Sequence, residues 1–313
     1  MKGRARIASE EAVHGVLVVD KPAGPTSHDV VDRVRRIFGT RRVGHTGTLD
    51  PFATGVLPVC VGKATRLARF LAAGEKAYRA TVRLGFATTT DDATGEPVGP
   101  TRLVEVSAEE VAAACRRLTG TILQVPPAYS AKRVAGRRLY ELARAGTVHT
   151  PEPVRVTVYE LIPVAAGGGG LELAVRCSPG TYVRALARDL GEALATGGHL
   201  RALRRTRSGE FTLEQAVPWD ELEAAGLRRL MPLEALLGSL PAVRVGPEGL
   251  AALRHGRDLD RRLVASIPEP PPERLRVLSE SGDLVALAVP RGYGLGGSLP
   301  VEPVLHPDVV LAD

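Results

Sequence analysis

The chain has 313 residues, enough for two average domains or for one large α/β domain with a small appendage. With 44% hydrophobic and 24% charged residues, its composition is that of a folded globular protein and excludes an intrinsically disordered one. Lysine and arginine outnumber aspartate and glutamate by 41 to 35, so a polyanion is a reasonable partner. Aromatic residues make up only 4%, which argues against single-strand binding through many stacking surfaces.

The cysteines and the N-terminus indicate a cytoplasmic protein. Cys60, Cys115 and Cys177 are far apart and form no C-x-x-C pair, so they predict neither a zinc site nor a disulfide framework. The only apolar run near the N-terminus, residues 15–19, is too short for a signal peptide or a membrane span. We therefore expect a soluble chain in a reducing compartment.

The N-terminal part predicts a strand, a helix and a loop. Residues 15–19 form an apolar run typical of a buried strand, which stops at the turn-forming residues 20–25. A helix follows, with a capping box that starts at Thr26 and a C-terminal Gly39. Residues 41–55 have no usable period and are rich in Gly, Thr, His and Asp, so we predict a loop there.

More strands and one further helix follow. Residues 78–84 alternate as a strand does, and residues 107–118 have a helical period behind a serine cap. Residues 154–158 and 171–177 alternate as an antiparallel pair, joined by a glycine-rich turn at 167–170. This order of elements favours an α+β fold with a mixed, mostly antiparallel sheet over regular βαβ winding.

Two domains are predicted, over residues 1–238 and 239–313. The first ends with a stretch at 218–237 that we predict to be helical. The second contains the short apolar runs 275–278 and 284–288, which predict a small β-rich domain.

The segment with the most chemical groups is Gly-His-Thr-Gly-Thr-Leu-Asp-Pro at residues 44–51. Its glycines let a ligand approach the backbone, and Pro51 stiffens the chain just after Asp50. Because no second acid lies nearby, Asp50 would act alone as a nucleophile. An ordinary Asp-Pro turn explains the same residues, so their types alone do not establish catalysis.

Other catalytic signatures are not found. Six residues separate Gly55 from Gly62-Lys63, where a phosphate loop has four, and Ala64 replaces the magnesium-binding Ser or Thr. No dinucleotide-binding fingerprint occurs, and the seven histidines have neither metal-ligand nor triad spacing.

Two basic segments are further candidates, at residues 127–144 and 201–207. Their charge fits a nucleic-acid contact and a solvated helix face about equally well. Tyr182 and Arg184 follow an alternating strand, so a sheet edge would present them to a ligand.

Residues 15–22, 44–51 and 178–184 resemble, in this order, the signature segments of TruB-type tRNA pseudouridine-55 synthases. The resemblance covers residues 14–237, and the C-terminal tail matches only loosely. It implies an α+β core with a mixed sheet, a thumb inserted at about residues 125–152 that grips RNA, and a small PUA-like C-terminal β domain.

The resemblance also implies roles for matched positions. Asp50 looks like the family's catalytic aspartate, Tyr78 like its active-site tyrosine, and Arg184 like the arginine that pairs with the aspartate. The positions that hold substrate or support the cleft are Lys21, His45, Tyr182 and Leu203. The side chains expected on the RNA backbone are Lys132, Arg137, Arg138, Arg144, Arg204 and Arg205. The sequence departs from the usual motifs at Thr48, Phe52 and Pro179, where Ala, Leu and Lys are common.

The implied reaction isomerises uridine 55 in the T-loop of tRNA to pseudouridine. It exchanges an N1–C1′ bond for a C5–C1′ bond without redox change or water, so we expect no cofactor and no metal. Asp50 must be ionised, and Arg184 is expected to hold its pKa low. Tyr78 is expected to stack on the uracil rather than take its proton, and His45 to fill the place that the flipped uridine leaves.

The implied enzyme is a monomer that acts alone on the T-arm of tRNA, with no protein partner and no membrane. One alternative is the guide-RNA-dependent class, which works with protein partners and lacks the long thumb that residues 129–150 would supply. The other is a catalytically silent RNA-binding or RNA-folding protein, which would release no tritium from C5-labelled tRNA.

Overall fold

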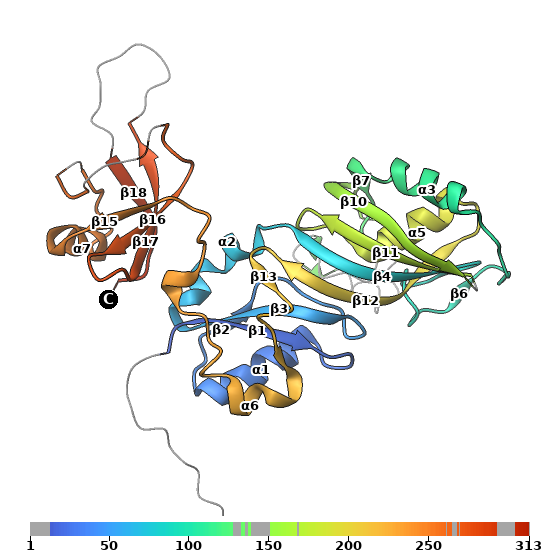
Figure 1. Cartoon of the computed structure of the whole chain (residues 1–313), viewed down its shortest axis with the longest axis horizontal. Coiled ribbons are helices and arrows are strands. Elements are labelled where there is room, and N and C mark those ends of the chain that lie inside the picture. The colour runs from blue at the N-terminus through green and yellow to red at the C-terminus, as the bar shows by residue number, and fades with distance from the viewer. Residues whose placement is uncertain are drawn as a thin grey trace, which may run out of the picture.

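The protein is described by a computed structural model. It describes residues 13–127, 133–134, 137–138, 151–167, 169–260, 262–264, 268, 270–292 and 304–312. Within these residues a ten-stranded mixed sheet and a separate four-stranded sheet dominate the molecule (Figure 1). The predicted α+β class and the separate β-rich C-terminal part are therefore confirmed.

The large sheet consists of β1 (Gly15–Lys21), β2 (Val43–His45), β3 (Thr54–Val61), β4 (Lys76–Leu84), β7 (Gly120–Gln124), β10 (Val154–Gly167), β11 (Gly170–Cys177), β12 (Gly198–Ser208), β13 (Phe211–Thr212) and β14 (Val217–Pro218). Its main order is β14-β1-β3-β12-β4-β11-β10-β7, while β2 pairs with β3 and β13 with β12. Only β1–β14 and β3–β12 are parallel pairs. The late strand β12 thus lies at the centre, between two strands from the first third of the chain.

Four described helices lie beside this sheet, and the sequence predicts the first and the third of them. They are α1 (Ser27–Phe38), α2 (Ala68–Ala72), α3 (Ala108–Arg117) and α5 (Val183–Ala193), with a 3₁₀ turn, η1 (Gly62–Leu67), before α2. Thr26 and Ser107 form the expected capping boxes of α1 and α3. Gly39 ends α1 at φ 61°, a left-handed conformation that glycine adopts without strain.

Two local predictions are wrong. Residues 218–237 form only the short helix α6 (Leu222–Ala225) and two 3₁₀ turns, η2 (Trp219–Glu221) and η3 (Leu233–Ala235), because Met231 exchanges both of its backbone hydrogen bonds with Val16 of β1 instead of continuing a helix. The segment 41–55 is not loop throughout. It contains β2 and the first residues of its partner strand β3, which begins at Thr54. Strand β2 has only three residues, too few to show an alternating pattern in the sequence.

The hydrophobic core has two layers on the large sheet. One face of β1 and β3 packs, through Leu17 and Leu57, into a cluster that continues under α1, α3 and α5. The opposite face packs, through Val16 and Val56, against Leu287 of the C-terminal sheet. The small sheet therefore rests on the large one through apolar contacts.

The C-terminal sheet has the order β15-β16-β17-β18, with strands Ala242–Val245, Leu275–Ser279, Leu284–Arg291 and Val304–Val310, and a helix, α7 (Pro247–Arg254), beside it. In Figure 1 it lies at one end of the molecule, in orange and red, far from β7 and β10. Two small two-stranded sheets complete the described elements, β5 (Ala87–Thr88) with β6 (Pro97–Val98) and β8 (Arg133–Val134) with β9 (Arg137–Arg138).

Most of the predicted thumb, residues 125–152, lies outside the described residues. Lys132 and Arg144 lie outside the described residues, and for Arg137 and Arg138 only the strand β9 is described. The three cysteines are buried free thiols. No described helix combines the length and apolarity needed to cross a bilayer.

Candidate active site

A cavity of about 360 Å³ opens where the loop before β3 faces β4, β12 and the start of α5. This volume lies in the range of small-ligand sites. Six predicted residues line the cavity, namely Asp50, Tyr78, Tyr182, Arg184 and Leu203 from the predicted site and Arg205 from the predicted RNA contacts. They come from four separate parts of the chain, and the fold of β12 between β3 and β4 brings them together.

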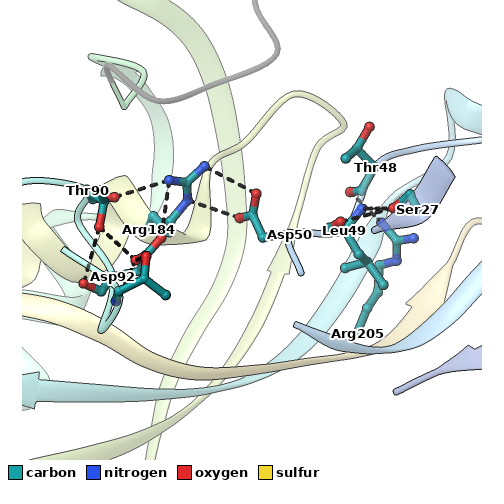
Figure 2. A network of polar contacts seen from close by, with 9 residues as sticks. Ser27, Thr48, Leu49, Asp50, Thr90, Asp92, Arg184 and Arg205 are labelled. Atoms are coloured by element: carbon teal, nitrogen blue, oxygen red, sulfur yellow. Dashed lines mark hydrogen bonds and ion pairs between the residues drawn. The ribbon is translucent and has the colours of Figure 1, made fainter. Parts of the chain in front are cut away.

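Asp50 and Arg184 form a two-point ion pair in the cavity wall (Figure 2). Arg184 Nε lies 3.0 Å from Asp50 Oδ2, and Arg184 Nη2 donates to Oδ1 at 3.3 Å. The arginine side chain is 8% exposed and the carboxylate 34% exposed. Such a fork fixes the orientation of a carboxylate while leaving part of it open to a ligand.

Arg184 is held from its other side by a segment that sequence reasoning missed. Its Nη1 donates to the Thr90 carbonyl at 3.1 Å and pairs with Asp92 Oδ2 at 3.3 Å. Asp92 in turn accepts hydrogen bonds from Thr90 Oγ1 and the Thr94 N–H. The run Thr-Thr-Thr-Asp-Asp-Ala-Thr-Gly, a typical Asx-turn composition, is the one signal that could have pointed to it.

The pKa of Asp50 moves opposite to the prediction. Burial raises it above its ordinary value, and the Arg184 guanidinium opposes this rise without reversing it. Asp92 adds a further, smaller rise, and Lys21 a smaller opposing effect. Arg184 therefore limits the cost of ionising a buried carboxyl group instead of holding its pKa low.

The loop that carries Asp50 is anchored on both sides of the carboxylate. Ser27 Oγ donates to the Leu49 carbonyl at 3.0 Å and accepts from the Leu49 N–H at 2.8 Å (Figure 2). Lys21 Nζ, on the other side, donates to the Pro51 carbonyl at 3.1 Å. These bonds give Asp50 a defined position although it lies in a loop.

Lys21 does not line the cavity, so the expected substrate contact is corrected to a supporting one. The side chain is fully buried, and burial lowers its pKa to about 8. His45 is half-buried in β2 and accepts the Gly47 N–H at 3.2 Å on Nδ1. It also lies outside the cavity lining, and burial lowers its pKa.

Arg205 is not at the surface, which contradicts its predicted contact with the RNA backbone. It is 2% exposed and donates to the carbonyls of Val56 at 2.7 Å, Gly47 at 3.1 Å and Thr48 at 3.4 Å. Arg205 lines the cavity, but its donors are engaged by these carbonyls and thus brace the Asp50 loop.

The neighbouring Arg204 points to the other face of the sheet, since successive residues of a strand alternate. Its side chain is 42% exposed and pairs with Asp20 through two bonds of 3.0 and 2.7 Å. Of the two arginines, only Arg204 is placed where a phosphate could approach.

Two side chains of β4 form one wall of the cavity. Burial raises the pKa of Tyr78, so its phenol stays neutral and is a poor base. Lys76, two residues earlier, projects from the same face and donates to the carbonyls of Ala72 at 3.0 Å and Gly74 at 2.9 Å. Burial, aided by Arg205, lowers the Lys76 pKa to about 8. The strand alternation with Tyr78 could have indicated Lys76, which the sequence prediction omitted.

The prediction that a sheet edge presents Tyr182 and Arg184 is wrong. Tyr182 precedes the first residue of α5, and Arg184 lies in the first turn of that helix. No group of three or more His, Cys, Asp or Glu side chains that could hold a metal ion occurs in the described part of the chain.

Comparison with known proteins decides the family. A model of the TruB family pseudouridylate synthase N-terminal domain matches residues 35–183, and one of the tRNA pseudouridylate synthase B C-terminal domain matches residues 184–238. The chain belongs to the TruB family of pseudouridylate synthases. Both models together end before the C-terminal sheet, and their junction falls inside α5, between Val183 and Arg184.

Relatives and solved structures agree with this assignment. The chain is 43% identical over 302 residues to tRNA pseudouridine synthase B of Solibacter usitatus, covering 95% of this chain and 99% of the relative. It is 52% identical over 251 residues to the Thermobifida fusca protein of the same name, covering 77% and 85%. A chain in the crystal structure of a Cbf5-Nop10-Gar1 complex is 27% identical, with a TM-score of 0.71 and coverage of 95% and 84%. The predicted enzyme class, a pseudouridine synthase, is confirmed.

Proposed function

We propose that the chain isomerises uridine 55 in the T-loop of tRNA to pseudouridine. The observation that carries this proposal is the Asp50 carboxylate, fixed by Arg184 and partly open to a cavity with two tyrosine side chains in its lining. The relatives named tRNA pseudouridine synthase B support tRNA as the substrate.

The chemistry needs one nucleophile and no cofactor. The N1–C1′ bond breaks, the C5–C1′ bond forms, C5 loses a proton and N1 gains one, so atoms and electrons balance within the nucleotide. Asp50 attacks the sugar or the uracil ring as a carboxylate. The neutral Tyr78 ring stacks on the uracil, and Leu203 packs beside it in the cavity lining.

The target uridine must leave its stack to reach Asp50, at a cost of a few kcal/mol. His45, next to the nucleophile loop, takes the vacated place in this proposal. Arg204 and the basic residues of segment 127–144 meet phosphates, which the net charge of +6 favours. In this proposal the enzyme works in the cytoplasm as a monomer and needs no protein partner.

Tritium release tests the function directly. A tRNA transcript made with [5-³H]uridine should lose tritium from one uridine per molecule when mixed with the purified chain, and a transcript with cytidine at position 55 should lose none. Equal release from both transcripts would place the target elsewhere in tRNA. No release from either would leave an RNA-binding protein.

The same assay separates the guide-RNA-dependent alternative. Similar chains occur in structures titled as a Cbf5-Nop10-Gar1 complex and as an H/ACA RNP bound to a substrate RNA. We expect this chain to act with no added protein or guide RNA. A requirement for either would overturn the stand-alone proposal.

The rate should fall toward acid pH at a higher pH than an ordinary carboxyl group would give. The active form of Asp50 is ionised, and its folded-state pKa is raised above 3.8, so activity is lost as pH falls through that raised value. The groups that act on it are Arg184, Asp92 and Lys21. Single-turnover rates across the pH range provide the measurement, and an acid limb at or below the ordinary carboxyl value would contradict it.

A further inference from the structure

A buried glutamine connects the end of β7 to the start of α5. Gln124 is the last residue of β7, and its side chain is fully buried. Its Oε1 accepts the Tyr182 N–H at 2.8 Å, and its Nε2 donates to the Tyr182 carbonyl at 3.1 Å. The same carbonyl accepts the Leu186 N–H, the first bond of the helix. One carboxamide therefore holds both peptide groups that flank Tyr182.

These peptide groups set the orientation of α5, the helix that carries Arg184. Tyr182 has extended backbone angles, φ −96° and ψ 109°, and its side chain does not cap α5. Because Gln124 fixes the planes on both sides of the Tyr182 Cα, it fixes the two torsion angles by which the strand turns into the helix. Arg184 follows two residues later, with Nε 3.0 Å from Asp50 Oδ2.

The next turn of α5 is tied to the same strand end. Arg188 lies four residues after Arg184, on the same helix face. Its Nη2 donates to the Val125 carbonyl at 3.0 Å, and its Nη1 pairs with Asp91 at 2.9 Å. The start of α5 and its next turn are thus both held by residues 124–125. The segment 90–92 holds Arg184 and Arg188 of the same two turns.

We propose that Gln124 is a positioning residue for the isomerisation, which acts by orienting Arg184 toward Asp50 and Tyr182 toward the bound base. The inference rests on the proposed function. Gln124 does not line the cavity, and its side chain bonds to the backbone of Tyr182 and not to the Asp50 carboxylate. It therefore acts only through Tyr182. A residue needed for stability alone would leave the rate per folded molecule unchanged.

The test compares the only two glutamines of the chain. Gln124→Met keeps the approximate volume and removes both bonds to Tyr182. Gln215→Met is the matched control, because the Gln215 side chain also bonds to the backbone. Its Oε1 accepts the Thr212 N–H at 2.8 Å, and Gln215 does not line the cavity. The readouts are the single-turnover rate on tRNA, the dissociation constant for tRNA and the melting temperature.

We expect Gln124→Met to slow the single-turnover step on the order of 10- to 100-fold, with tRNA affinity within about threefold. The acid limb of its rate profile should move to higher pH, since a displaced Arg184 no longer offsets the burial of Asp50. Gln215→Met should match the wild type. An unchanged rate, or a slower rate with an unmoved acid limb, would overturn the positioning role.

A second variant covers the case in which Gln124→Met does not fold. Gln124→Glu keeps the shape and, because burial favours the protonated carboxyl group, it keeps both an acceptor for the Tyr182 N–H and a donor for the Tyr182 carbonyl. Its rate relative to wild type should be nearly normal at low pH and fall as pH rises and the group loses its donor, and a ratio that stays constant with pH would overturn the proposal. If the wild-type chain itself releases no tritium, the proposed function fails instead, and the two failures are distinct.

Discussion

Asp50→Asn should abolish pseudouridine formation while leaving tRNA binding almost intact. The amide keeps the size of the side chain and can still accept a hydrogen bond from Arg184, but it is not a nucleophile. We expect the single-turnover rate to fall by more than about 10⁴-fold, as for loss of the nucleophile in other enzymes. Filter binding should give a dissociation constant within about threefold of wild type, because one partly buried carboxylate adds little to a contact made mainly with phosphates.

Asp20→Asn is the matched control for this variant. Asp20 also pairs with an arginine through two hydrogen bonds, and its side chain is 29% exposed, close to the 34% of Asp50. It does not line the cavity, so its loss should leave the rate within about twofold. Substantial turnover by Asp50→Asn, or an equal loss in both variants, would remove Asp50 from the chemical role.

Arg205→Met should destabilise the protein far more than Arg204→Met, although the two residues are adjacent. Loss of Arg205 leaves the carbonyls of Val56 and Gly47 without their buried donor, which costs about 2–4 kcal/mol. For a chain of 313 residues the melting temperature should fall by about 3–6 °C. Arg204 is in a partly exposed ion pair, so its loss should cost no more than about 1 kcal/mol.

Thermal melting of both variants in one buffer checks this difference. The RNA-binding readout should show the reverse order, since Arg204 is the arginine proposed to meet phosphate. Arg204→Met should lower the salt dependence of tRNA binding, whereas the folded fraction of Arg205→Met should retain it. Equal melting temperatures would mean that the buried guanidinium does not brace the Asp50 loop.

Features that depend on neighbouring residues were predictable. The capping boxes at Thr26 and Ser107 involve residues three positions apart, and the structure contains both. Alternation predicted β4 and the β10–β11 pair for the same reason. The order of the TruB motifs identified Asp50, Tyr78, Tyr182, Arg184 and Leu203, all of which line one cavity.

Features that depend on pairing between distant segments were not predictable from the sequence. Strand β12 has irregularities in its pairing with β4 between residues 200 and 202 and between 205 and 207. Its register with β4, and not the local sequence, therefore decides which arginine points inward. The predicted helix at residues 218–237 is wrong for a related reason, because Met231 pairs with Val16 of β1 and this distant partner interrupts the helix.

The sequence by itself determined the family and the α+β class, and its motifs singled out Asp50 as the proposed nucleophile, since all three rest on residue types in short segments. The tertiary structure decided that Arg204 is exposed while Arg205 braces the site. Asp92, Gln124 and Arg205 act on partners 58 to 158 residues away along the chain. Burial and hydrogen bonding at such separations arise only once the sheet has assembled, so no local pattern encodes them.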